Sequence, residues 1–161
     1  MKKILFVAIA AIGLFACNNN AGNKTTGEDT LQEEVIVEPT PEQRLPWKLA
    51  YDSVSGNFTP LPQGKIADTT TAAGIIADIN TLWPEVQAIY QKTSGDTIFV
   101  TIPDSEYLTQ RMGSSGPASY ITLVTYSLTE LPGIRKVNFK FEEGDHATPG
   151  TYTRENLKTI Q

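Results

Sequence analysis

Four side chains that could bind a metal ion or transfer a proton lie within five residues near the end of the chain. They are Glu142, Glu143, Asp145 and His146, and His146 is the single histidine of the sequence. Carboxylate oxygens bind hard divalent cations and an imidazole titrates near neutral pH, so this loop has the chemistry of a ligand site or an acid–base pair. Adjacent residues of a strand point to opposite faces, however, and Glu142 and Glu143 follow a strand pattern. The sequence therefore favours a solvated strand end, with Glu143, Asp145 and His146 as a candidate ligand loop.

The rest of the composition argues against metal and cofactor chemistry. One histidine cannot supply a metal site that needs two imidazoles, and the single cysteine, Cys17, cannot form a cysteine-based zinc site. The glycines match neither the dinucleotide-binding nor the P-loop spacing. We therefore expect no metal, no cofactor, no catalytic residue and a protein that is not an enzyme.

Cys17 lies where a basic start and an apolar run end. Lys2 and Lys3 precede the apolar run Ile4–Ala16, an arrangement typical of a secretory signal. As a helix this run would be about 20 Å long, too short for a hydrocarbon core of about 30 Å. The sequence therefore predicts a signal peptide at residues 1–16 rather than a membrane-spanning helix.

The end of this signal, Leu14-Phe15-Ala16-Cys17, resembles the lipobox of bacterial lipoproteins. In that family a peptidase cuts before a cysteine that carries a diacylglycerol thioether, so the resemblance implies lipid attachment at Cys17. Two or three acyl chains hold a protein on a membrane effectively permanently. An ordinary secretory signal followed by a chance cysteine is the alternative.

The charge of the chain restricts its partners. The formal net charge is −5, and removal of Lys2 and Lys3 with the signal makes it more negative by two. An acidic chain without a basic cluster is a poor partner for nucleic acid. We expect a lipid-anchored protein on the cell membrane or outer membrane that faces the periplasm and binds an envelope protein or itself.

Composition divides the remaining chain in two. Residues 17–46 are rich in Asn, Thr, Glu and Pro, which predicts a lipidated, disordered tether. Residues 47–161 carry periodic apolar positions and predict one domain.

The periodic positions of that domain predict its elements. Strands are expected at 47–51, 86–92, 97–102 and 137–141, with a hairpin turn at 93–96. Helices are expected from Ala72 to Pro84 and over 119–129, where start and stop residues outweigh β-branched composition. This order predicts an α+β fold, a small antiparallel or mixed sheet with two helices packed on one face.

The stretch from Asp96 to Gly144 resembles the GerMN domain of spore germination and sporulation proteins, which also occurs in envelope lipoproteins. The likeness lies in the strand Thr97–Ile102, the segment Asp104–Leu108, the helix Ser119–Thr129 with Leu128–Ile134 after it, and Lys136–Phe139. The resemblance implies a non-catalytic interaction and assembly module.

Two functions are therefore expected from different classes. The first is a membrane-anchored envelope module that contacts partners through sheet edges or through the strand face bearing Lys136, Asn138 and Lys140. The second is a ligand-binding protein or weak hydrolase acting on cell-wall glycan or peptide. It would use Glu143, Asp145 and His146 beside an aromatic cleft, although the aromatic residues of such a cleft, Trp47, Tyr51, Trp83 and Tyr90, have the spacing of core positions.

Overall fold

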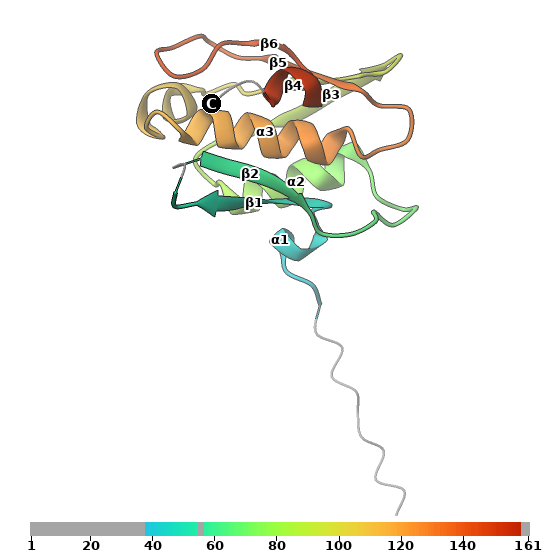
Figure 1. Cartoon of the computed structure of the whole chain (residues 1–161). Coiled ribbons are helices and arrows are strands. Elements are labelled where there is room, and N and C mark those ends of the chain that lie inside the picture. Colours follow the sequence, from blue (N-terminus) through green and yellow to red (C-terminus); the bar gives the residue numbers. More distant parts are fainter. Residues whose placement is uncertain (1–37, 55–56, 159–161) are drawn as a thin grey trace, which may run out of the picture. The chain divides into compact units, whose positions relative to one another are not determined.

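The computed structural model describes residues 38–54 and 57–158, and all of these belong to one compact unit. Figure 1 shows the elements. In chain order they are α1 (Pro41–Arg44), β1 (Trp47–Asp52), β2 (Asn57–Pro62), α2 (Ala72–Leu82), β3 (Ile89–Ser94), β4 (Thr97–Thr101), the π-helical turn η1 (Tyr107–Arg111), α3 (Gly116–Leu128), β5 (Lys136–Lys140), β6 (Gly150–Tyr152) and α4 (Arg154–Leu157).

The larger sheet has four strands in the order β3-β4-β5-β6. β3 pairs antiparallel with β4, β4 parallel with β5, and β5 antiparallel with β6. A parallel pair needs a long crossover connection, and η1 and α3 provide it between β4 and β5. The sheet is therefore mixed.

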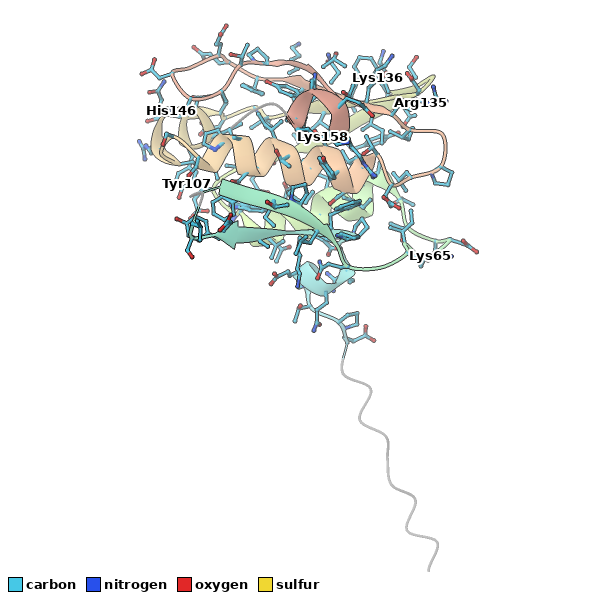
Figure 2. The ribbon with its side chains drawn as sticks, in the orientation of Figure 1. Lys65, Tyr107, Arg135, Lys136, His146 and Lys158 are labelled. Carbon is cyan, nitrogen blue, oxygen red and sulfur yellow. The ribbon has the colours of Figure 1, made fainter. Side chains whose placement is uncertain are left out.

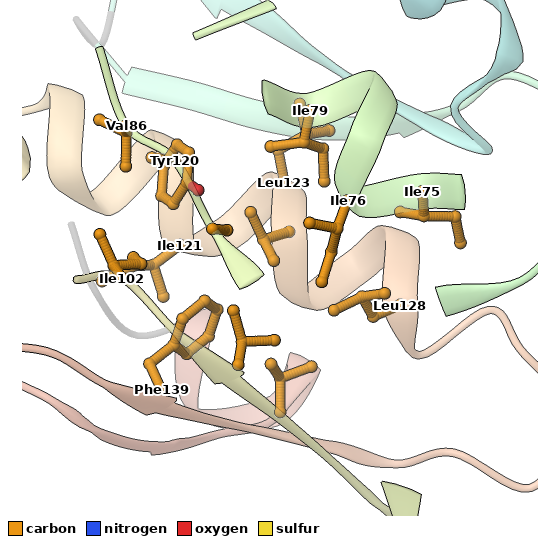
Figure 3. Close-up of a cluster of buried hydrophobic side chains, with 14 of the residues drawn as sticks. Ile75, Ile76, Ile79, Val86, Ile102, Tyr120, Ile121, Leu123, Leu128 and Phe139 are labelled. Carbon is orange, nitrogen blue, oxygen red and sulfur yellow. The ribbon is translucent and has the colours of Figure 1, made fainter. Parts of the chain in front are cut away.

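One face of this sheet carries the core. Ile98 and Val100 of β4 and Val137 and Phe139 of β5 are buried, and the residues between them lie on the other face. α2 and α3 pack on the buried face, and Figure 3 shows Ile76 of α2, Ile121 and Leu128 of α3 and Phe139 of β5 in one cluster of buried side chains. The predicted α+β fold, with two helices on one face of a mixed sheet, is confirmed.

The β1–β2 hairpin forms a second sheet of two strands on α3. The strand predicted at 47–51 therefore exists but does not join the sheet of β3 to β6, so the expectation of a single sheet is wrong. β2 was not predicted, because Pro60 and Pro62 are unusual within a strand.

α3 contacts both the hairpin and the larger sheet, and most of its side chains are buried. This double burial explains a helix with so many apolar and β-branched residues. α3 spans Gly116–Leu128 with Pro117 in its first turn, so the helix predicted over 119–129 exists and begins three residues earlier. Tertiary contacts thus outweigh the strand propensity of 119–129.

Several element boundaries differ from the prediction by one to three residues, and the start of β3 is one of them. β3 begins at Ile89 rather than residue 86, since the side-chain amide of Asn80 holds the backbone of Ala88 in a connection, with bonds of 2.9 Å to its N–H and its C=O.

Folded structure also begins before residue 47. Thr40 caps α1, Arg44 forms an ion pair with Asp78, and Leu45 is only 2% exposed. The predicted edge of the domain at 47 is therefore too late, because one capping residue and one leucine do not change the composition of a polar segment. The predicted signal peptide, Cys17 and the tether up to residue 37 lie outside the described residues.

Candidate interaction surface

The candidate ligand loop lies against η1. Gly144 N–H donates to Ala147 O (3.2 Å), and His146 N–H donates to Thr109 O (3.1 Å). A methyl group added at Gly144 would lie 2.6 Å from Thr109 Cβ, so only glycine fits this contact. The loop is thus fixed by its backbone.

The side chains of this loop do not converge. Glu143 Oε1 accepts from the Thr148 hydroxyl (3.1 Å). Asp145 instead faces the side-chain amide of Gln110. The amide nitrogen lies 3.3 Å from Asp145 Oδ2, and the amide oxygen lies 3.2 Å from the Asp145 backbone nitrogen. Glu143, Asp145 and His146 are exposed. Among the described residues no group of three His, Cys, Asp or Glu side chains could hold a metal ion. The structure does not assemble a ligand site from this loop.

The second predicted feature is the face of β5 that bears Lys136, Asn138 and Lys140. All three lie opposite the buried Val137 and Phe139, as expected. Lys136 Nζ lies 3.4 Å from Asp96 Oδ2, and Asn138 Nδ2 donates to Thr151 Oγ1 (2.8 Å). Figure 2 shows Lys136 and His146 at opposite ends of the larger sheet, so the start of this face lies away from the acidic loop.

The strand that bears these lysines is not an edge. β5 lies between β4 and β6, so its backbone groups are already paired. The pKa of the Asp96 carboxyl is lowered mainly by a hydrogen bond from the Thr97 hydroxyl and, to a smaller extent, by its contact with Lys136. The β5 face therefore offers side-chain contacts only, and the free edges of this sheet are β3 and β6.

The four aromatic residues of the expected cleft do not line one common site. Trp47 and Trp83 line a groove of about 560 Å³, while Tyr90 lines a smaller pocket of about 370 Å³. Trp47, Trp83 and Tyr90 are partly buried against the core. The larger groove is lined mostly by apolar side chains, among them Leu49 of the hairpin, Leu82 of α2 and Leu123 of α3, and no residue of the acidic loop lines it. A hydrolytic site combining the two is therefore not formed.

Exposed apolar side chains gather on the β1–β2 hairpin. Among the described residues five large hydrophobic side chains are exposed, and four of them belong to this hairpin. They are Tyr51 (60% exposed), Val54 (95%), Phe58 and Leu61, whereas the fifth, Ile89, lies on β3. The rings of Tyr51 and Phe58 contact each other with centroids 5.1 Å apart. Leu61, opposite Lys48, lies on the other face of the hairpin, so the exposed apolar patch is the Tyr51–Phe58 pair, and an exposed apolar patch marks a contact surface.

A polar cluster fixes the start of this hairpin to the body of the domain. Glu130 Oε2 accepts from Trp47 Nε1 (3.0 Å) and from Arg154 (2.7 Å). The Arg154 guanidinium also stacks on the rings of Trp47 and Tyr126, 4.9 and 5.2 Å from their centroids. The hydrogen bonds from Arg154 and then from Trp47 lower the pKa of Glu130. This Trp47–Glu130–Arg154 clamp joins β1, the end of α3 and α4.

Neither the hairpin patch nor the clamp was found by sequence reasoning. Glu130 and Arg154 are far from Trp47 in the chain, and no local pattern connects them. The alternating apolar residues of β1 predicted a strand, but alternation does not show that Tyr51, at the end of that strand, stays exposed.

Comparison with known proteins adds no relative. The chain matches no family model, no curated protein and no solved structure. The GerMN resemblance stays a prediction that rests on the residues named for it. Within the described part of the chain, no helix has the length and apolar character needed to cross a bilayer.

Proposed function

We propose that the chain is a non-catalytic interaction module of a bacterial envelope, anchored by a lipid on Cys17 and contacting its partner through the β1–β2 hairpin. The observation that carries the contact surface is the concentration of exposed apolar side chains on this hairpin. The clamp supports it, because it holds the hairpin in place by Trp47 and leaves the Tyr51–Phe58 end exposed. A rigid scaffold with a presented apolar patch suits protein binding.

The order of elements supports the same proposal. The strand β4, the gap filled by η1, the helix α3 and the strand β5 follow in the order that the GerMN resemblance implies. In the acidic loop, Glu143 is hydrogen-bonded to Thr148 and Asp145 faces the amide of Gln110. These local contacts favour a structural role of the loop over a catalytic one.

The test is crosslinking capture from the protein's own membranes, with mass spectrometry of the captured proteins. A Tyr51→Ser, Phe58→Ser variant removes the exposed ring pair and is expected to lose the captured partner. Ile89→Ser is the matched control, because Ile89 is the exposed apolar residue outside the hairpin. Cys17→Ser tests the anchor, and its loss of membrane association is expected.

A charge reversal of Lys136 and Lys140 tests the other predicted face. Capture that survives the hairpin variant but is lost on charge reversal would refute the hairpin as the contact surface. Capture unaffected by every variant would refute both surfaces.

A second candidate function is binding of cell-wall glycan, and the groove lined by Trp47 and Trp83 favours it. Indole rings stack on the apolar faces of sugars, and ligand pockets are mostly apolar. Calorimetry with soluble wall fragments tests this function. Heat that is lost in Trp83→Ala but kept in Trp83→Phe would support it, and absence of heat would exclude it.

A further inference from the structure

The direction of the backbone groups in the β1–β2 hairpin follows from one hydrogen bond. Gln63 N–H donates to Pro46 O (2.8 Å), and the register continues from there as Trp47 opposite Pro62. Opposite pairs of an antiparallel ladder alternate between bonded and non-bonded. Because the 46/63 pair is bonded, residues 47, 49 and 51 and residues 58, 60 and 62 point their N–H and C=O groups away from the partner strand.

The two outer edges of the hairpin are therefore unequal. On β2, positions 60 and 62 are prolines, which have no N–H, so Phe58 supplies the one outward donor of that strand. On β1, Leu49 and Tyr51 each have an outward N–H and an outward C=O, and no strand of the described chain lies beyond them (Figure 1). The third outward residue of β1 is Trp47, and its carbonyl oxygen already accepts from Gln63 Nε2 (3.4 Å), so Leu49 and Tyr51 are the residues that remain for a new strand. β1 is the edge that can accept another strand.

We propose that a second copy of this chain pairs with this edge, β1 against β1, in an antiparallel register with its two-fold axis at Ala50. Leu49 of each copy then lies opposite Tyr51 of the other. Both residues have outward backbone groups, so the two copies form a continuous four-stranded sheet. The proposal rests on the proposed function and names the partner of the hairpin.

Charge complementarity selects this register. With the axis at Ala50, Lys48 of each copy lies opposite Asp52 of the other, so two pairs of opposite charges face each other across the junction. An axis at Leu49 or at Tyr51 would also match the backbone groups, but it would place Ala50 opposite Lys48 or opposite Asp52. Ala50 is small enough for the close approach of a non-bonded pair on the axis.

The apolar side chains fit the same arrangement. Tyr51, 60% exposed in one chain, lies opposite Leu49 of the other copy on the face that carries the Phe58 ring. Aromatic and aliphatic residues opposite each other stabilise neighbouring strands. Anchoring both chains to one membrane raises their local concentration and favours the pairing.

Disulfide crosslinking of the full chain in its own membranes tests the register. Ala50→Cys places two thiols opposite each other on the axis, at a separation that a disulfide can span. Thr59→Cys is the matched control, because Thr59 is the hairpin partner of Ala50 but lies on β2. We expect a covalent dimer under mild oxidation with Ala50→Cys, and none with Thr59→Cys or with the parent chain that has Cys17 alone.

Charge exchange on the Ala50→Cys background tests the selectivity. Lys48→Asp or Asp52→Lys alone places like charges opposite each other and is expected to lower the yield of dimer by about tenfold. The double variant Lys48→Asp, Asp52→Lys is expected to restore it. Tyr51→Pro, compared with Tyr51→Ala, removes the outward N–H and also restricts φ at position 51, and it is expected to lower the yield by about tenfold again.

The outcomes separate this inference from the proposed function. Equal crosslinking of Ala50→Cys and Thr59→Cys would refute the two-fold pairing, and so would a double charge variant no better than the single ones. If a different envelope protein is captured through the hairpin while Ala50→Cys stays monomeric, the pairing is wrong and the proposed function stands.

Discussion

Removing the carboxylate of Glu130 is the sharpest test of how the hairpin is held. In Glu130→Ala the Trp47 indole N–H and the Arg154 guanidinium both lose their acceptor. Hydrogen bonds to a buried charged group contribute about 1.5–3 kcal/mol, and exposed ion pairs only about 0.2–1 kcal/mol. Glu130 and Arg154 are 33% and 28% exposed, between these limits, so we expect a loss of about 2 kcal/mol in the free energy of unfolding.

The measurement is urea unfolding of the purified protein near pH 7, followed by tryptophan fluorescence. Glu106→Ala is the matched control, because the Glu106–Arg111 pair has a similar length of 2.6 Å but is 63% exposed on both sides. We expect this control to change the free energy by at most about 0.5 kcal/mol.

The pH dependence gives an independent check. Since the pKa of Glu130 is lower in the folded state than its ordinary value of 4.5, its contribution is complete above that value and is lost as the pH falls through the folded pKa. The difference between the parent and Glu130→Ala should therefore be full at neutral pH and shrink in acid. A Glu130→Ala variant as stable as Glu106→Ala, or a difference that grows in acid, would refute the clamp.

Three further substitutions test other parts of the fold by the same unfolding assay. Tyr120→Phe should keep or raise stability, by up to about 1 kcal/mol, because the buried Tyr120 hydroxyl has no partner among the described residues and its burial raises the pKa of the phenol; a clear loss would reveal a hidden partner. Gly144→Ala should cost more than about 1 kcal/mol through the clash with Thr109, and an unchanged midpoint would show that the loop moves freely. Thr71→Ala should cost about 1 kcal/mol, because the Thr71 hydroxyl accepts from Gly74 N–H (3.1 Å) at the start of α2, and Thr71→Ser should restore most of it.

Periodicity predicted the interior elements of the domain well. α2 and α3, with β4 and β5, are where alternating or helical apolar spacing placed them, since each of these elements has a buried side that the pattern records. β2 could not be predicted because its prolines are tolerated only where the outward N–H is dispensable, and that depends on its partner strand. The short elements α1, β6 and α4 are too brief to show a period.

The candidate site was predicted less well, for a physical reason. Glu143, Asp145 and His146 are close in the sequence, but exposed side chains on a loop point wherever local hydrogen bonds hold them. The lysine face of β5 was placed correctly, because alternation along a strand fixes which residues share a face. The hairpin surface depends on contacts between distant parts of the chain, which no local pattern contains.

The prolines of β2 also set a limit on how many chains the hairpin can join. A strand that adds to β1 uses the edge with outward donors, while Pro60 and Pro62 leave the opposite edge of the hairpin with little to offer a further strand. Growth into a fibre requires two competent edges on every subunit, one for each neighbour. Through this hairpin each chain has a valency of one, so pairing along it stops at two chains.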